Sequence, residues 1–291
     1  MHSWQTTRFQ IDLSRPRIMG IVNVTPDSFS DGGQHASASA ALRHCEQLLR
    51  EGADVLDIGG ESTRPGSPPV PLAEELARVR PVLQGALKLG APVSIDTCKP
   101  EVMAEALALG VDIINDIWAL RRGQAQAVVA AHPNCGVCLM HMHGEPATMQ
   151  QAPMPGSPAE AVAAVADFLQ ERSQSLHALG VARERIVIDP GIGFGKTPEQ
   201  NLALLARQRE LLAATGAPLL AGWSRKSTLG LLLADEGQPL PAPGERISAS
   251  VAAALIAVQR GAALVRVHDV AATAQALKVW AAVQALSGSE S

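Results

Sequence analysis

The chain has 291 residues, of which 47% are hydrophobic and 18% are charged, and its 24 basic and 28 acidic side chains give a formal net charge of −4. It contains four Trp, four Phe and no Tyr. A chain this apolar is not expected to be disordered. Without a basic excess or a stock of aromatic platforms, it is not expected to bind nucleic acid either.

Eight short β-branched runs alternate with Ala- and Leu-rich segments of helical periodicity. The predicted strands cover residues 18–23, 55–59, 93–97, 113–117, 137–142, 186–189, 219–223 and 264–268. Several of the helical segments end at a Gly, the residue that most readily adopts the left-handed conformation past a helix end. Strands that alternate with helices predict parallel βαβ units.

Eight such units match the α/β class and, within it, the (β/α)8 TIM barrel; an open doubly wound sheet is the alternative. We expect a single-domain barrel over residues 18–287, with residues 1–17 capping its bottom and residues 288–291 forming a polar tail. The first 17 residues show no apolar signal-peptide core, and the longest apolar run, 251–258, is too short to cross a membrane. Four scattered cysteines do not suggest a disulfide framework, so we expect a protein of the cytoplasm without a membrane partner.

Polar residues lie at or just after the carboxyl end of every predicted strand, whereas the amino ends carry apolar residues or residues with no evident function. They are Asn23, Asp57, Glu61, Asp96, Asn115, His141, Asp189, Arg225, Lys226, Arg266 and His268. In a barrel these ends converge on one mouth, where active sites lie. Asp96, Asn115 and Asp189 can accept hydrogen bonds from the N–H edge of a flat heterocycle. A basic set can hold phosphates or carboxylates: Arg64, Arg225, Lys226, Arg266 and His268.

Several long motifs occur in one order along nearly the whole chain. They are IMGIVNVTPDSFSDGG from residue 18, GADVLDIGGESTRPG from 52, VSIDTCKP from 93, IINDI from 113, LMHMHG from 139, IDPGIGFGKTPEQNLALL from 188, SRKS from 224 and RVHDV from 266. With these motifs the chain resembles the dihydropteroate synthase family, the pterin-binding enzymes that sulfonamides target. The family joins p-aminobenzoate to (7,8-dihydropterin-6-yl)methyl diphosphate and so makes 7,8-dihydropteroate for folate biosynthesis.

The resemblance also implies roles for individual residues and a Mg²⁺ cofactor. Asn23 is expected to ligate Mg²⁺, and Thr63, Arg266 and His268 to hold the diphosphate. Asp96, Asn115, Asp189 and Lys226 are expected to bind the pterin ring and form the catalytic set, with Ile117, Met140 and Phe194 as apolar walls. Phe29, Arg64 and Pro65 would shape the aminobenzoate pocket, and Ser227 would meet the aminobenzoate carboxylate. The resemblance further implies a homodimer.

Two other functions stay open at this point. One is methyl transfer from methyltetrahydrofolate to a corrinoid, against which the motif at residues 224–227 and the set Asn23, Arg266 and His268 argue. The other is a non-catalytic paralogue that binds pterin, which the complete loops after the first two strands disfavour.

Some residues permit a structural interpretation as well as a functional one. Residues 190–197 nearly spell a P-loop, but Pro190 stands where that motif needs Gly. We interpret the segment as a glycine-rich turn leading into a helix at Pro198, and with Phe194 as a pterin wall it keeps both a structural and a binding role. Cys135 and Cys138 are expected to be buried thiols, because residues three apart on a strand face opposite sides.

Other side chains at the mouth are harder to assign. We interpret His141 as a satisfied polar residue and not as a zinc ligand. Lys88, Lys99 and Lys196 read as solvated surface charges. Two interpretations of Arg225 stay open, a contact with an anion and a salt bridge. Asp57 and Glu61 are expected to hold the loop that follows them.

Overall fold

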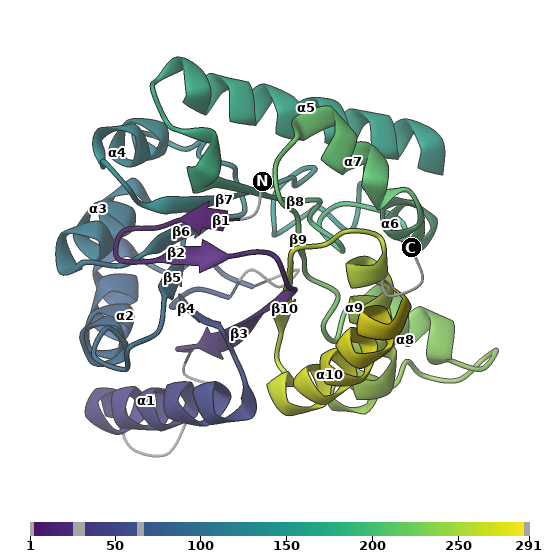
Figure 1. Ribbon diagram of the computed structural model, residues 1–291, viewed down its shortest axis with the longest axis horizontal. Coiled ribbons are helices and arrows are strands. Elements are labelled where there is room, and N and C mark those ends of the chain that lie inside the picture. The colour runs from purple at the N-terminus through teal and green to yellow at the C-terminus, as the bar shows by residue number, and fades with distance from the viewer. Residues whose placement is uncertain (1–2, 26–32, 63–66, 288–291) are drawn as a thin grey trace.

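The computed structural model describes residues 3–25, 33–62 and 67–287, and it forms one eight-stranded parallel sheet rolled into a barrel (Figure 1). The strands are β3 (Arg17–Asn23), β4 (Val55–Gly59), β5 (Val93–Asp96), β6 (Ile113–Asp116), β7 (Gly136–Met140), β8 (Ile186–Asp189), β9 (Leu220–Ala221) and β10 (Leu264–Val267). Their spatial order is β8-β7-β6-β5-β4-β3-β10-β9, and an isolated parallel bridge between Ile188 and Leu219 closes the ring. The predicted TIM barrel is confirmed.

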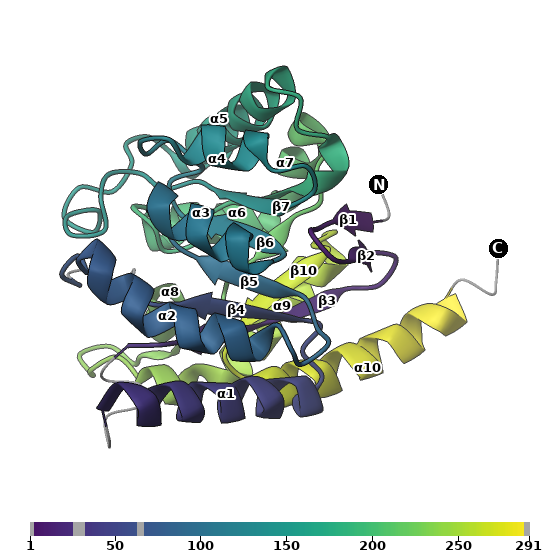
Figure 2. The same ribbon diagram turned by 90° about the vertical axis from the view of Figure 1, so that its left-hand side faces the viewer.

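Helices surround the sheet in Figures 1 and 2 and cover its outer face. They are α1 (Gly33–Glu51), α2 (Leu72–Ala86), α3 (Pro100–Leu109), α4 (Ala125–Ala131), α5 (Pro158–Ala178), α6 (Pro198–Ala206), α7 (Gln208–Thr215), α8 (Ser227–Leu233), α9 (Ile247–Gln259) and α10 (Val270–Ser287), with short 3-10 turns at Arg183–Arg185 and Pro243–Arg246. None of the described helices combines the length and the hydropathy that a membrane span requires.

Five of the predicted strands run too far at their carboxyl ends. β5, β6 and β10 stop one residue earlier than predicted, β7 stops at Met140, and β9 keeps only two residues. Beyond these ends, side chains bond to elements outside the sheet; Thr97, for example, donates its hydroxyl to Glu75 of α2 at 2.6 Å. The strand ends therefore pass directly into the loops that build the mouth.

A hairpin that the sequence pattern did not predict precedes the barrel. It pairs β1 (Ser3–Gln5) with β2 (Gln10–Asp12) in antiparallel register. Trp4 is fully buried, and its indole N–H donates to the carbonyl of Arg185 at 2.9 Å, immediately before β8. Figure 2 places the hairpin and the far end of α10 on the same side of the molecule.

The barrel interior changes character along each strand. A cluster around Trp4 fills the amino-terminal end with Met19, Val55, Ile113, Cys138, Val187, Leu220 and Leu264. Because side chains alternate across a strand, the residue two positions further along faces the interior again. On four of these strands that residue is polar: Asp57, Asn115, Asp189 and Arg266. The same alternation that builds an apolar plug therefore delivers the polar groups one layer higher.

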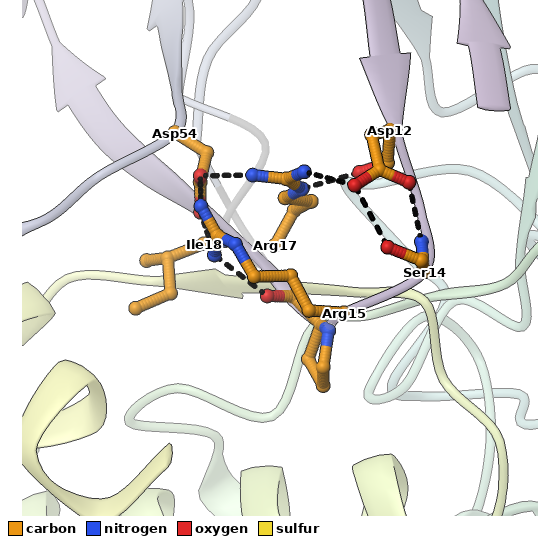
Figure 3. A network of polar contacts seen from close by, with 7 residues as sticks. Asp12, Ser14, Arg15, Arg17, Ile18 and Asp54 are labelled. Carbon is orange, nitrogen blue, oxygen red and sulfur yellow. Dashed lines mark hydrogen bonds and ion pairs between the residues drawn. The ribbon is translucent and has the colours of Figure 1, made fainter. Parts of the chain in front are cut away.

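The amino ends of the strands carry buried charged residues, contrary to the prediction that they are apolar or without notable polar groups. Asp54, just before β4, accepts bonds from Arg15, Arg17 and the backbone N–H of Ile18, and Figure 3 shows how Asp12 continues this network. Asp112, just before β6, is fully buried and pairs with Arg8 at 2.6 Å. The partners lie in the amino-terminal segment, far away in sequence, so a reading of each strand alone could not find them.

Candidate functional site

Arg266 is the central cation of the barrel mouth. From β10 its Nε donates to Asp57 Oδ2 at 2.6 Å and its Nη2 donates to Asp96 Oδ2 at 2.7 Å. Asn115 donates its amide to the same Asp57 oxygen at 3.2 Å. Asp57 therefore holds Arg266 and Asn115, and its carboxylate makes no bond to the described part of the loop that follows it. Glu61 does contact that loop, by accepting from the backbone N–H of Val70 at 3.3 Å.

The carboxyl of Asp96 is held in an unfavourable environment for a charge. Burial raises its pKa to about 7, in spite of the opposing pull of Arg266, and the carboxylates of Asp57 and Asp116 raise the pKa further. Asp96 shares one guanidinium with Asp57, so the two acids compete for one cation. Part of the hydrogen-bonding capacity of Asp96 is therefore left for a ligand, and an N–H edge would supply what the protein does not.

Asp189 and Lys226 form the opposite side of the mouth. Burial raises the pKa of Asp189, whose Oδ1 accepts from the N–H of Gly191 at 2.7 Å. Burial also lowers the pKa of Lys226 to about 8, although the Asp189 carboxylate opposes that shift. The Lys226 ammonium lies 4.3 Å from the ring centre of Phe194 and makes no hydrogen bond to the described residues. Both groups are charged, largely enclosed and short of partners.

An apolar wall lies beside these polar groups. Ile117, Met140, Met142 and Met149 form one buried cluster, against which Phe194 and Trp118 pack. The structure thus brings together the three predicted wall residues Ile117, Met140 and Phe194. A cavity of about 160 Å³ opens next to this wall and is lined by Asp96, Ile117, Trp118 and Arg122, among others. A flat ring with polar edges suits such a surface.

Three further predicted residues stand around the rim. Asn23 ends β3, and its side chain makes no hydrogen bond within the described residues. The Nδ1 atom of His268 hydrogen-bonds Ser224 Oγ at 2.9 Å, so Ser224 orients the imidazole. Ser227 is exposed at the first turn of α8. The remaining predicted residues, Phe29, Thr63, Arg64 and Pro65, lie outside the described residues.

Two lysines interpreted as solvated surface charges are instead bonded to protein groups, Lys196 buried and Lys99 half-buried. Lys196 is 3% exposed and donates to the carbonyls of His141, Gly191 and Phe194. Lys99 forms ion pairs with Glu61 and Glu75. Their burial follows from loops that fold back onto the strand ends, which residue type alone does not reveal. Lys88 is exposed, as predicted.

His141 is buried but not satisfied as predicted, since its Nδ1 has no hydrogen-bond partner. Burial lowers the pKa of this imidazole to about 2, and the ring stacks edge-on against Phe168 at 5.0 Å. His141 directly follows the end of β7, and its ring contacts α5 through Phe168. It therefore packs as a neutral ring.

The structure shows the local contacts of three other features that the sequence left open. Arg225 forms a two-bond salt bridge with Asp269, at 2.6 and 3.0 Å. Cys135 and Cys138 are buried free thiols. Residues 190–197 form a glycine-rich turn that leads to a capping box between Thr197 and Gln200. Within the described residues no cluster of three or more His, Cys, Asp or Glu side chains is arranged to hold a metal ion.

Sequence reasoning missed three contributors to the mouth: Ser224, Glu75 and Lys196. Ser224 directly precedes Arg225 and Lys226 in the SRKS motif, and this position is the signal that could have identified it. Glu75 lies within α2, where an acidic residue usually faces solvent, and nothing in its surroundings in the sequence marks it as buried. Lys196 lies between a glycine and a helix cap, so its direction depends on the three-dimensional course of the turn.

Comparisons with known proteins identify the class of this barrel. A family model described as pterin binding enzyme matches residues 19–268. The dihydropteroate synthase of Neisseria meningitidis serogroup B is 52% identical over 286 residues, covering 97% of this chain and 98% of that protein. The chain belongs to the pterin-binding enzymes, and within them to the dihydropteroate synthase family.

Solved structures support the same assignment. Dihydropteroate synthase of Burkholderia cenocepacia complexed with 7,8-dihydropteroate is 50% identical, with a TM-score of 0.87 over 99% of this chain and 98% of that one. The Xanthomonas albilineans enzyme with 4-aminobenzoic acid is 49% identical, with a TM-score of 0.87 over 97% and 99% of the two chains. At such identity and coverage the likeness extends over nearly the whole chain.

Proposed function

We infer that this chain is a transferase that joins p-aminobenzoate to (7,8-dihydropterin-6-yl)methyl diphosphate and releases 7,8-dihydropteroate and diphosphate. The observation that carries this inference is that the buried Asp189 and the half-buried Lys226, both incompletely paired, lie at the same strand ends of the barrel as Asp96 and Asn115, beside an apolar wall. The relatives, which carry the synthase name over nearly the full chain, favour this reaction over methyl transfer to a corrinoid.

The pterin ring is bound by its polar edge and its faces. Asp96 and Asp189 would accept hydrogen bonds from ring N–H groups, and Asn115 would present its amide beside them. Carboxylates that are poorly hydrated gain most from such donors, since a charge-assisted bond replaces lost solvation. Phe194 and Met140 would contact the ring faces.

Breaking the bond between the pterin methylene carbon and the diphosphate oxygen is the demanding step in this scheme. Electron density from the ring supports the developing cation, which the carboxylate of Asp189 stabilises. Negative charge grows on the departing oxygens, where Arg266 and His268 present fixed donors. Because the aniline nitrogen of p-aminobenzoate attacks without prior deprotonation, no strong general base is needed.

Mg²⁺ fits the donor set at this rim. Asn23 offers an amide oxygen that makes no hydrogen bond to the described residues, and Mg²⁺ commonly takes its remaining ligands from substrate phosphates and water. Asn23 would hold the ion, which supplies charge neutralisation for the diphosphate. A metal cluster built from protein groups alone is not required.

The aminobenzoate carboxylate is assigned to Ser227. Its hydroxyl is exposed at the start of α8 next to Lys226, so a carboxylate there would lie beside a donor and a cation. Thr63 is proposed to help hold the diphosphate, and Phe29, Arg64 and Pro65 to complete the aminobenzoate pocket, by the family resemblance alone.

We further propose a homodimer in the cytoplasm. The exposed apolar side chains Val279, Val283 and Leu286 on α10 support a contact between subunits. The four described cysteines are all unpaired, which is usual in a reducing compartment.

Incubation of the purified chain with both substrates and Mg²⁺ tests the reaction. We expect release of diphosphate together with formation of dihydropteroate, and loss of both products when p-aminobenzoate is omitted or EDTA is added. Binding of pterin without any product would instead indicate a non-catalytic paralogue. Lys226→Ala serves as the matched variant, and wild-type turnover in that variant would refute the pterin-site assignment.

A further inference from the structure

Lys196 is a buried cation that bonds only to the backbone. Its Nζ donates to the carbonyl oxygens of Gly191 at 2.9 Å, Phe194 at 3.2 Å and His141 at 3.3 Å. An ammonium has three N–H groups, so these bonds use its whole donor capacity. The side chain therefore contributes nothing directly to a ligand.

The three carbonyls come from two segments that are pressed together. A Cβ built on Gly191 would lie 1.8 Å from the carbonyl oxygen of His141, and one built on Gly195 would lie 2.1 Å from that of His143. Both glycines have a positive φ, at 65° and 67°. Converging carbonyl oxygens repel one another, and a cation between them removes that repulsion. Lys196 thus allows the turn to approach the end of β7 this closely.

The same turn carries two of the groups assigned to the pterin ring. The N–H of Gly191 donates to Asp189 Oδ1 at 2.7 Å, and the N–H of Phe194 donates to the Gly191 carbonyl at 3.1 Å. The Phe194 ring in turn lies 4.3 Å from the Lys226 ammonium. A shift of the turn would therefore move an acceptor and a ring wall together.

We propose that Lys196 is a positioning residue for pterin binding: its ammonium clamps the turn 191–195 against the end of β7 and so sets Asp189 and Phe194. This inference rests on the proposed function, because it assumes that these two residues contact the pterin. The Lys196 charge also acts on Asp189, since it opposes the rise of that carboxyl's pKa. Burial lowers the pKa of Lys196 to about 7, although the Asp189 carboxylate opposes that shift.

Arg185 provides a matched control at the other end of the same strand. It is 5% exposed and donates to the carbonyls of Cys135 at 2.7 Å, Val129 at 3.0 Å and Pro133 at 3.3 Å. Both residues are buried cations bonded to backbone carbonyls, but Arg185 precedes β8 and Lys196 follows it. A purely structural role would make the two substitutions equivalent.

The test compares Lys196→Met with Arg185→Met in the full chain. Affinity for 7,8-dihydropterin is measured by calorimetry, the KM of each substrate by diphosphate release, and folding by circular dichroism. We expect Lys196→Met to weaken pterin binding and raise the KM for the pterin diphosphate by roughly 10- to 100-fold, with the KM for p-aminobenzoate at saturating pterin diphosphate close to wild type. Arg185→Met should keep wild-type pterin affinity.

The proposal is overturned if folded Lys196→Met binds pterin like the wild type, or if Arg185→Met loses the same affinity. Should Lys196→Met not fold, Lys196→Gln retains two N–H donors and is judged by the same criterion. A wild-type chain that neither binds pterin nor releases diphosphate would remove the proposed function itself and this inference with it. Normal wild-type turnover alongside an unaffected Lys196→Met would remove only the inference.

Discussion

The two ends of the barrel both bury charges, but they pair them differently. At the amino end, Asp112 accepts three bonds from Arg8 and one from the backbone N–H of Val93. The network around Asp54 in Figure 3 is likewise closed by arginines from the first 17 residues. At the carboxyl end, Asp189 has one backbone donor, and Lys226 has an aromatic ring instead of an anion.

This difference assigns the amino-end charges mainly to stability and the incompletely paired charges at the carboxyl end mainly to function. A buried charge with a full set of partners holds distant segments together. Removing one partner leaves the other charge buried without compensation, which is strongly destabilising. A buried charge that lacks partners lowers the stability of the free protein but is ready for a ligand. Substitutions at the two ends should therefore move different measurements.

The largest expected effect is the loss of turnover in Lys226→Met. Removing a cation that would contact the substrate should lower kcat/KM by roughly 10²- to 10³-fold. Because the ammonium has no ion-pair partner among the described residues, the free energy of unfolding should be unchanged or higher. Diphosphate release and urea unfolding measure the two quantities, and a large loss of stability would contradict the comparison.

Asp112→Ala should show the opposite behaviour. It leaves the buried N–H of Val93 and the Arg8 guanidinium without their carboxylate, so we expect the free energy of unfolding to fall by roughly 3 kcal/mol. The KM values of the folded protein should not change, since the residue lies at the far end of β6. A changed KM for the pterin diphosphate, measured well below the unfolding transition, would show that the two ends are coupled.

The sequence predicts the architecture well because the barrel is built from local signals. Helix stops at glycine or short β-branched runs mark most units, and period-two alternation places Asp57 two residues after Val55 on the interior. The same alternation identifies Asn115, Asp189 and Arg266. These residues are predictable because the strand geometry determines where their side chains point.

Residues in turns and helices are not predictable in this way. Where the Lys196 side chain points depends on glycines with positive φ in the turn that carries it. The burial of Glu75 depends on its ion pair with Lys99, which lies on a different segment. Asp54 and Asp112 need arginines from the first 17 residues, a segment for which no hairpin was predicted. Each of these cases depends on contacts between segments that no local pattern encodes.

The pH dependence of stability and of turnover should distinguish Lys226 from the fully paired charges at the amino end. Burial lowers the pKa of Lys226 to about 8 from its ordinary 10.5, so between pH 8 and 10.5 the unfolded chain binds more protons at this group than the folded chain does. The free energy of unfolding therefore rises with pH across that window, by roughly 3 kcal/mol. Turnover should fall over the same range, because the ammonium loses its charge.

Urea unfolding and kcat/KM measured from pH 7 to 10.5 test this opposition. Lys226→Met serves as the control, because it lacks the titrating group and its stability should omit this rise. A difference in stability between wild type and Lys226→Met that is constant across the window would contradict the assignment.

Substitution of Arg225 should change stability and turnover the least. This residue tests the comparison directly, because it lies at the mouth but is paired, as the amino-end charges are. Its guanidinium makes two bonds to Asp269 and is about one third exposed. We expect Arg225→Met to lower the free energy of unfolding by about 1 kcal/mol and to reduce turnover far less than Lys226→Met does. A loss of turnover as large as that of Lys226→Met would mean that position at the mouth, and not incomplete pairing, determines which charges serve the reaction.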